Sequence, residues 1–128
     1  MEHRGRRPGA SDMALVDVGT VLGLQRRLGH QRCQEIVEEA IYGVTDRVAR
    51  AEKALDRDVP IMALNYAREL EEMCLQIGLS RMGRVASDLI DTLEREDSVA
   101  ANAIMARLVR LAEESLFCLV TLDSEGGA

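Results

Sequence analysis

Two segments of this chain carry three closely spaced glutamates each, and carboxylates at helical spacing can hold a pair of metal ions. The two groups comprise Glu35, Glu38, Glu39, Glu69, Glu71 and Glu72. A di-metal carboxylate site between helices requires inward-facing glutamates and a Glu-x-x-His spacing. The chain contains no Glu-x-x-His. We therefore interpret these glutamates as solvated helix faces, and we expect neither a metal nor another cofactor.

Cysteine and histidine are the other residues here that could act as metal ligands or nucleophiles. The three cysteines, Cys33, Cys74 and Cys118, form no CxxC pair and have no histidine at ligand spacing. An odd count without such spacing disfavours a disulfide framework and a zinc site. Each cysteine falls on an apolar helical stripe, so we expect three small core residues.

Only two histidines are present. His3 lies in a polar N-terminal stretch, and His30 follows Gly29 in a predicted turn. We interpret His30 as an exposed turn residue, and no histidine occurs after it. The chain has no Gly-rich phosphate loop and no Ser/His/Asp set. The sequence therefore predicts no catalytic residue and no enzyme.

Apolar residues recur at steps of three and four, which is typical of amphipathic helices. A short helix is expected from Asp17 to Gly29, and longer ones over about 31–55, 60–77, 80–93 and 98–120. Connections of two to five residues force neighbouring helices to run antiparallel. The pattern predicts an all-α fold, namely an antiparallel up-down-up-down four-helix bundle with a short N-terminal helix.

Particular residues are expected to begin and end these helices. Asp17 and Ser80 are side chains that can cap a helix N-terminus, and Pro60 suits a first turn. Gly78 can adopt the left-handed conformation that ends a helix. Asp97 or Ser98 is expected to begin the last helix.

Composition and charge exclude several classes of protein. The net charge is −6 and the acidic residues are spread along the chain, whereas a nucleic-acid groove needs clustered lysine and arginine. No segment approaches the roughly 18 apolar residues of a membrane span, and no apolar run of a signal peptide follows Arg7. We expect a cytoplasmic protein, with a disordered tail over 1–14, one domain over 15–122 and a frayed end over 123–128.

The segment Asn65–Met82, NYARELEEMCLQIGLSRM, resembles the signature segment of histidine-containing phosphotransfer (HPt) domains. In that family the segment runs approximately Ala-His-x-Leu-Lys-Gly, then four or five small residues, Gly-Leu and the next helix. Leu70 and Gly78-Leu79 match this frame. The resemblance implies a helical bundle that docks a response-regulator receiver domain or a histidine kinase.

The same alignment places three residues that oppose phosphotransfer on the functional positions of the family. Arg68 occupies the position of the phosphorylated histidine, Glu71 that of the lysine, and Glu72 that of the glycine which makes room for the phosphoryl group. A guanidinium stays protonated and cannot act as the nucleophile. The resemblance therefore implies a degenerate HPt domain without phosphotransfer activity.

Our leading hypothesis is a pseudo-HPt binding module in two-component or phosphorelay signalling. Its docking face would comprise residues on one side of the third long helix, namely Arg68, Glu71, Glu72, Leu75 and Gln76. On that face Arg68 could approach the acidic pocket of a receiver, or it could be a surface residue bonded to Glu72.

The alternative hypothesis is a structural or oligomerising helical bundle with no phosphorelay role. An exposed apolar patch containing Leu79, Met82 or Phe117 would favour it, with a homodimer as the simplest assembly. A third hypothesis, transfer of phosphate through an unrecognised residue, has no supporting motif.

Overall fold

A computed structural model describes residues 9–10 and 13–126 of the chain. Within these ranges the chain forms five α-helices and no strand, which confirms the predicted all-helical class. The expected tail over 1–14 and frayed end over 123–128 fall partly outside the described residues. None of the described helices combines the length and apolar character that crossing a membrane requires.

Each predicted helix is present, and the ends differ by at most one residue except in the last helix, which continues six residues beyond the predicted end at 120. The helices are α1 (Val18–Leu28), α2 (His30–Asp56), α3 (Pro60–Ile77), α4 (Ser80–Glu94) and α5 (Ser98–Gly126). The expectation that Ser80 caps α4 is wrong. Leu79 occupies the cap position and no side chain bonds to the first turn, so Ser80 is the first helical residue.

Other predicted helix signals are confirmed. The Asp17 carboxylate accepts hydrogen bonds from the backbone N–H of Gly19 at 3.0 Å and from the Thr20 hydroxyl at 3.1 Å. Asp97 accepts from the backbone N–H of Ala100 at 3.1 Å and begins α5. Pro60 is the first residue of α3, where its missing N–H costs no hydrogen bond.

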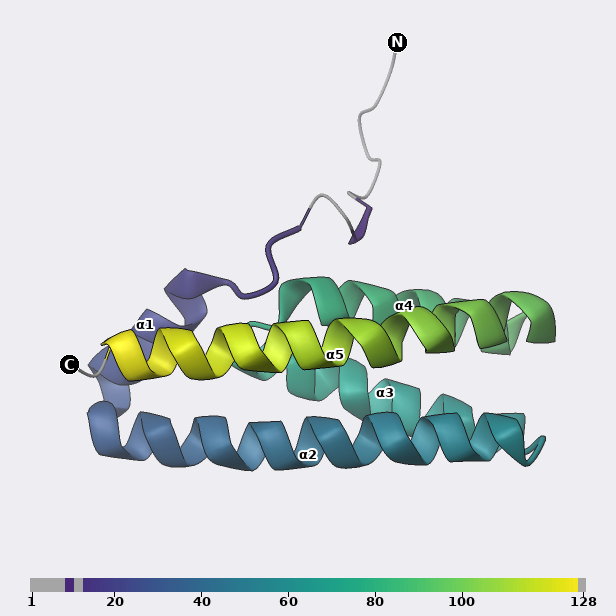
Figure 1. Cartoon of the computed structure of the whole chain (residues 1–128), viewed down its shortest axis with the longest axis horizontal. Helices are drawn as coiled ribbons and strands as arrows, with labels where there is room; N and C mark the ends of the chain where they lie inside the picture. The colour runs from purple at the N-terminus through teal and green to yellow at the C-terminus, as the bar shows by residue number, and fades with distance from the viewer. Residues whose placement is uncertain (1–8, 11–12, 127–128) are drawn as a thin grey trace, which may run out of the picture.

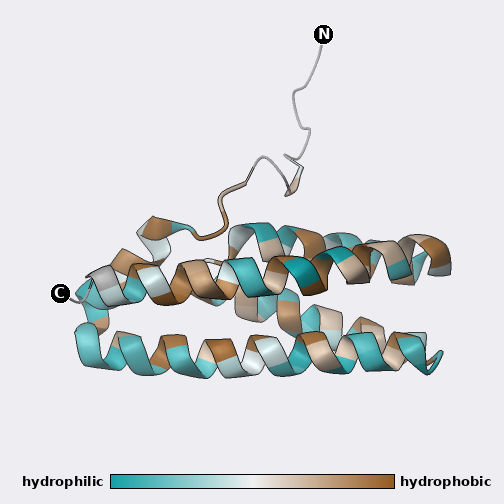
Figure 2. Ribbon diagram, viewed as in Figure 1, coloured by the Kyte–Doolittle hydropathy of each residue, from teal (hydrophilic) through white to brown (hydrophobic). Residues whose placement is uncertain are grey.

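The four long helices pack in a closed ring. α2 contacts α3, α3 contacts α4, α4 contacts α5, and α5 returns to α2, while α1 lies against α2 and α5 at one end (Figure 1). Apolar residues alternate with polar ones along each helix (Figure 2). The largest fully buried side chains are Leu70, Leu79, Met82, Leu89, Leu108 and Leu119.

α2 and α3 approach closely at Gly43. A Cβ atom at that position would lie 2.6 Å from Cε of Met73, so the end of this flexible side chain would have to move if Gly43 were replaced. Met82 and Met105 are buried in the core, whereas Met62 is 45% exposed.

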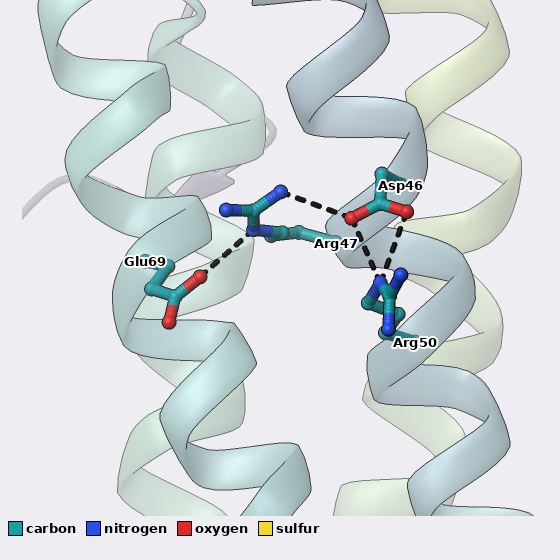
Figure 3. Close-up of polar contacts among 4 residues, drawn as sticks. All are labelled: Asp46, Arg47, Arg50 and Glu69. Atoms are coloured by element: carbon teal, nitrogen blue, oxygen red, sulfur yellow. Dashed lines mark hydrogen bonds and ion pairs between the residues drawn. The ribbon is translucent and has the colours of Figure 1, made fainter.

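An ion-pair network on the outside of the same interface joins α2 to α3 (Figure 3). Arg47 donates from Nε to Glu69 at 2.8 Å and from Nη1 to Asp46 at 2.9 Å. Arg50, one turn further along α2, also donates to Asp46, at 2.9 Å. Glu69 lies one helical turn from Met73, so the network flanks the contact between Met73 and Gly43.

Candidate functional site

The predicted docking residues lie on the side of α3 that faces away from the core. Ala67, Leu70 and Cys74 are fully buried on the inner side of the helix. Residues three and four positions apart share a helix face, so Arg68, Glu72 and Leu75 emerge together on the other side. Leu75 is 79% exposed on this outer side.

A cavity of about 520 Å³ lies between α3 and α4, closed at one end by the start of α1. Its lining includes four of the five predicted docking residues, namely Arg68, Glu71, Glu72 and Leu75. Gln76 is exposed but is not part of the lining. A volume of this size falls within the range typical of binding pockets.

Residues of α1 and α4 complete the cavity, and none of them was predicted. Asp17 and Thr20 contribute from the start of α1, and Gly83, Arg84 and Ser87 contribute from α4. The small residues Ser80, Gly83 and Ser87 recur at steps of three and four, so one side of α4 presents little bulk toward α3. That spacing was a signal available in the sequence.

The docking of α1 fixes this end of the cavity. The backbone N–H of Asp17 donates to the carbonyl oxygen of Gly78 at 2.7 Å. Gly78 has φ +84° and ψ 22°, the left-handed conformation predicted for a helix end. A Cβ atom on Gly78 would lie 2.9 Å from Cβ of Thr20, so glycine is required both for the turn and for the approach of α1.

Arg68 forms an ion pair beside the cavity. Its Nη2 lies 2.8 Å from Oε2 of Glu94 on α4, and the two side chains are 53% and 49% exposed. Arg68 is thus a surface residue, as one of the two interpretations held, but the predicted bond to Glu72 is wrong. The arginine instead links α3 to α4 beside the cavity.

Arg84 is the second cation of the cavity, and it is much less exposed. Its side chain is 18% exposed, and its Nε lies 3.5 Å from Oδ1 of Asp88 one turn on. The Nε atom is buried and, among the described residues, has no hydrogen-bond partner. Both arginines of the lining thus already face a carboxylate of this chain.

Cys74 borders the cavity without being reactive. Its side chain has no exposed surface. Burial, with a smaller contribution from the charge of Glu71, raises the pKa of the Cys74 thiol to about 12. A thiol with this pKa stays protonated near neutral pH and is a poor nucleophile.

The remaining candidate residues do not gather at the cavity. His30 is exposed as the first residue of α2, and His3 lies outside the described residues. Glu35, Glu38 and Glu39 are exposed on α2, as expected for a solvated face. No group of three or more His, Cys, Asp or Glu side chains in the described part of the chain is placed to hold a metal ion.

A second, smaller polar cluster lies between α1, α2 and α5. Asp123 is 6% exposed and accepts from the Cys33 thiol at 3.8 Å and from Nε2 of Gln25 at 3.5 Å. Burial raises the pKa of the Cys33 thiol, and the negative charge of Asp123 raises it further. The predicted core position of Cys33 is confirmed, whereas Cys118 is half-buried.

Comparisons with family models, with curated proteins and with solved structures found no match to this chain.

Proposed function

We propose that the protein is a pseudo-HPt binding module in two-component or phosphorelay signalling. In this proposal α2–α5 form an antiparallel up-down-up-down four-helix bundle of the HPt type, and α1 covers one end. The closed ring of helix contacts supports that architecture. The module docks a receiver domain or a histidine kinase without accepting a phosphoryl group.

One observation carries the proposal. The cavity between α3 and α4 contains the positions that align with the HPt histidine, lysine and glycine, and these positions hold Arg68, Glu71 and Glu72. A partly apolar pocket at this place supports docking, because the anchor side chains of protein–protein interfaces fill such pockets. At the histidine position the Arg68 guanidinium can form hydrogen bonds to a partner but cannot act as the phosphoryl acceptor.

The three differences from the HPt pattern all oppose phosphotransfer. The Arg68 guanidinium has no free nucleophilic nitrogen at neutral pH. Glu71 and Glu72 place negative charge where a phosphoryl group would need a cation and space. The buried, protonated thiol of Cys74 supplies no substitute nucleophile.

A binding assay with matched variants tests the proposed docking face. Receiver domains and histidine-kinase domains from the same genome are titrated with wild-type protein, with Leu75→Ser and with Phe117→Ser. Leu75 and Phe117 are 79% and 75% exposed, so neither change should disturb folding.

The proposal predicts that at least one domain binds and that Leu75→Ser weakens binding about tenfold or more. Loss of an exposed apolar side chain that becomes buried in a complex can account for this factor. Phe117→Ser, on α5, should bind like the wild type. The proposal fails if no domain binds, or if the two variants lose affinity equally.

The structural or oligomerising bundle stays the second candidate, because of α5. Phe117 and Val120 are 75% and 44% exposed and lie about one turn apart. The larger patch expected for this alternative is absent, since Leu79 and Met82 are fully buried. Light scattering distinguishes the two candidates: a stable dimer that Phe117→Ser converts to monomer favours the second.

A further inference from the structure

We infer that the partner of the α3–α4 cavity presents a basic surface with an apolar recess, in which Lys or Arg side chains meet Glu71 and Glu72 while the recess receives Leu75. This inference rests on the proposed function and deepens it, because it specifies the chemistry of the contacting surface. It also opposes the expectation that Arg68 approaches an acidic pocket.

The charges that line the cavity do not balance. Asp17, Glu71 and Glu72 are negative, and Arg68 and Arg84 are positive. Each arginine is already paired within the chain, Arg68 with Glu94 at 2.8 Å and Arg84 with Asp88 at 3.5 Å. Carboxylates therefore outnumber guanidinium groups in and around the cavity.

Among the described residues that line the cavity, Glu71 and Glu72 are the carboxylates with no partner in this chain. Neither forms an ion pair with any other described side chain. Asp17 differs, since its carboxylate caps α1 through Gly19 and Thr20. An approaching carboxylate would thus meet net repulsion at this mouth, whereas an approaching ammonium or guanidinium group would meet attraction.

Leu75 supplies the apolar part of the contact. It lines the same cavity as the two glutamates and is more exposed than any other leucine among the exposed large hydrophobic residues. Glu71, Glu72 and Leu75 fall within five consecutive residues of α3, so one partner surface can reach all three. An exposed leucine flanked by uncompensated carboxylates fits a partner surface that combines apolar and basic residues.

Neutralising Glu71 and Glu72 tests this inference, because the inference predicts that the partner then binds more weakly. The probe is the receiver or kinase domain that binds the wild type most tightly in the panel above. The variant Glu71→Gln/Glu72→Gln is compared with Glu113→Gln/Glu114→Gln, a pair of adjacent exposed glutamates on α5. Both variants change the net charge equally, so any difference reports the location of the charges.

We expect Kd to rise about 2- to 20-fold for Glu71→Gln/Glu72→Gln, because each exposed charge pair contributes modestly to binding. The control variant should keep the wild-type Kd. Raising the salt concentration from about 50 mM to about 500 mM should weaken wild-type binding. It should also reduce the difference in Kd between the wild type and Glu71→Gln/Glu72→Gln.

The possible failures are separable. If a domain binds and Glu71→Gln/Glu72→Gln binds as tightly as the wild type or more tightly, the basic-partner inference is wrong and the docking proposal stands. Equal weakening in both variants also overturns the inference, because the effect then reflects net charge alone. If no domain binds the wild type, the proposed function and the inference fall together.

Discussion

Arg68 illustrates what a single residue can and cannot indicate before the structure is known. Its position opposite the core follows from helical spacing, and so do the positions of Glu71, Glu72 and Leu75 on the same side of α3. The partner of Arg68 could not be predicted. Glu94 lies 26 residues away, and its approach depends on how α3 and α4 are rotated against each other.

The cysteines provide a prediction at the residue scale. Cys74 is fully buried with a pKa of about 12, so at pH 8 only about one thiol in ten thousand is ionised. Cys118 is half-buried and should react first with a maleimide reagent in the native protein. Cys33 and Cys74 should react as fast as Cys118 only in denaturant.

Mass mapping of the labelled peptides checks this order. Labelling of native Cys74 as fast as Cys118 would contradict the burial of Cys74 beneath the cavity.

At the scale of helices and their connections, the sequence predicts a helix end correctly where a residue type has a single structural role at that position. Asp17, Pro60 and Gly78 begin or end helices as predicted. The prediction that Ser80 caps α4 is wrong because a serine before an apolar run can be either the cap or the first helical residue. Contacts between helices, such as Met73 against Gly43, left no local signal because they depend on packing.

Gly78→Ala tests how the connection between α3 and α4 holds α1. The new methyl group would force a left-handed φ of +84° on alanine and would lie 2.9 Å from Cβ of Thr20. We expect a loss of about 1–3 kcal/mol in the free energy of unfolding. Urea denaturation measures it.

Gly23→Ala is the matched control. Nothing lies within 4 Å of a Cβ atom at Gly23, and alanine favours a helix interior by about 0.5–1 kcal/mol. This variant should be slightly more stable than the wild type. Equal destabilisation of both variants would contradict the special role assigned to Gly78.

The ion-pair network between α2 and α3 should respond to acid. The hydrogen bond from Arg50, followed by the charges of Arg50 and Arg47, lowers the pKa of Asp46. A lowered pKa in the folded state gives stabilisation that is present above the ordinary aspartate value of about 3.9 and is lost as pH falls through the folded value. Asp46→Asn should therefore be less stable than the wild type at pH 7, and this difference should shrink below about pH 4.

Thermal unfolding of the wild type and Asp46→Asn at several pH values between about 2.5 and 7 measures how their stability difference changes with pH. Arg50→Gln should show the same pH dependence, because it removes the first cause of the lowered pKa. A stability difference that stays constant down to pH 2.5 would show that Asp46 is not stabilised by these pairs.

For the whole molecule, periodicity and short connections were enough to predict the helical class and each helix. A cavity is harder to predict, since it is defined by what three elements leave unfilled. Asp17 is far from the docking residues in the sequence. Gly83 and Arg84 lie on α4, for which the sequence predicted no docking residue. The proposed function therefore depends on where α1 and α4 place side chains beside the docking residues of α3.

Transfer of labelled phosphate tests most directly the claim that this face has kept docking and lost phosphotransfer. A receiver domain that binds the protein is phosphorylated with radiolabelled phosphate and mixed with wild type or with Arg68→His/Glu71→Lys/Glu72→Gly, at concentrations that saturate the weaker binding expected once Glu71 and Glu72 are replaced. The account predicts that the label stays off the wild type and moves to the introduced imidazole of the variant. Label on the wild-type chain, or a folded and bound variant that remains unlabelled, would contradict it.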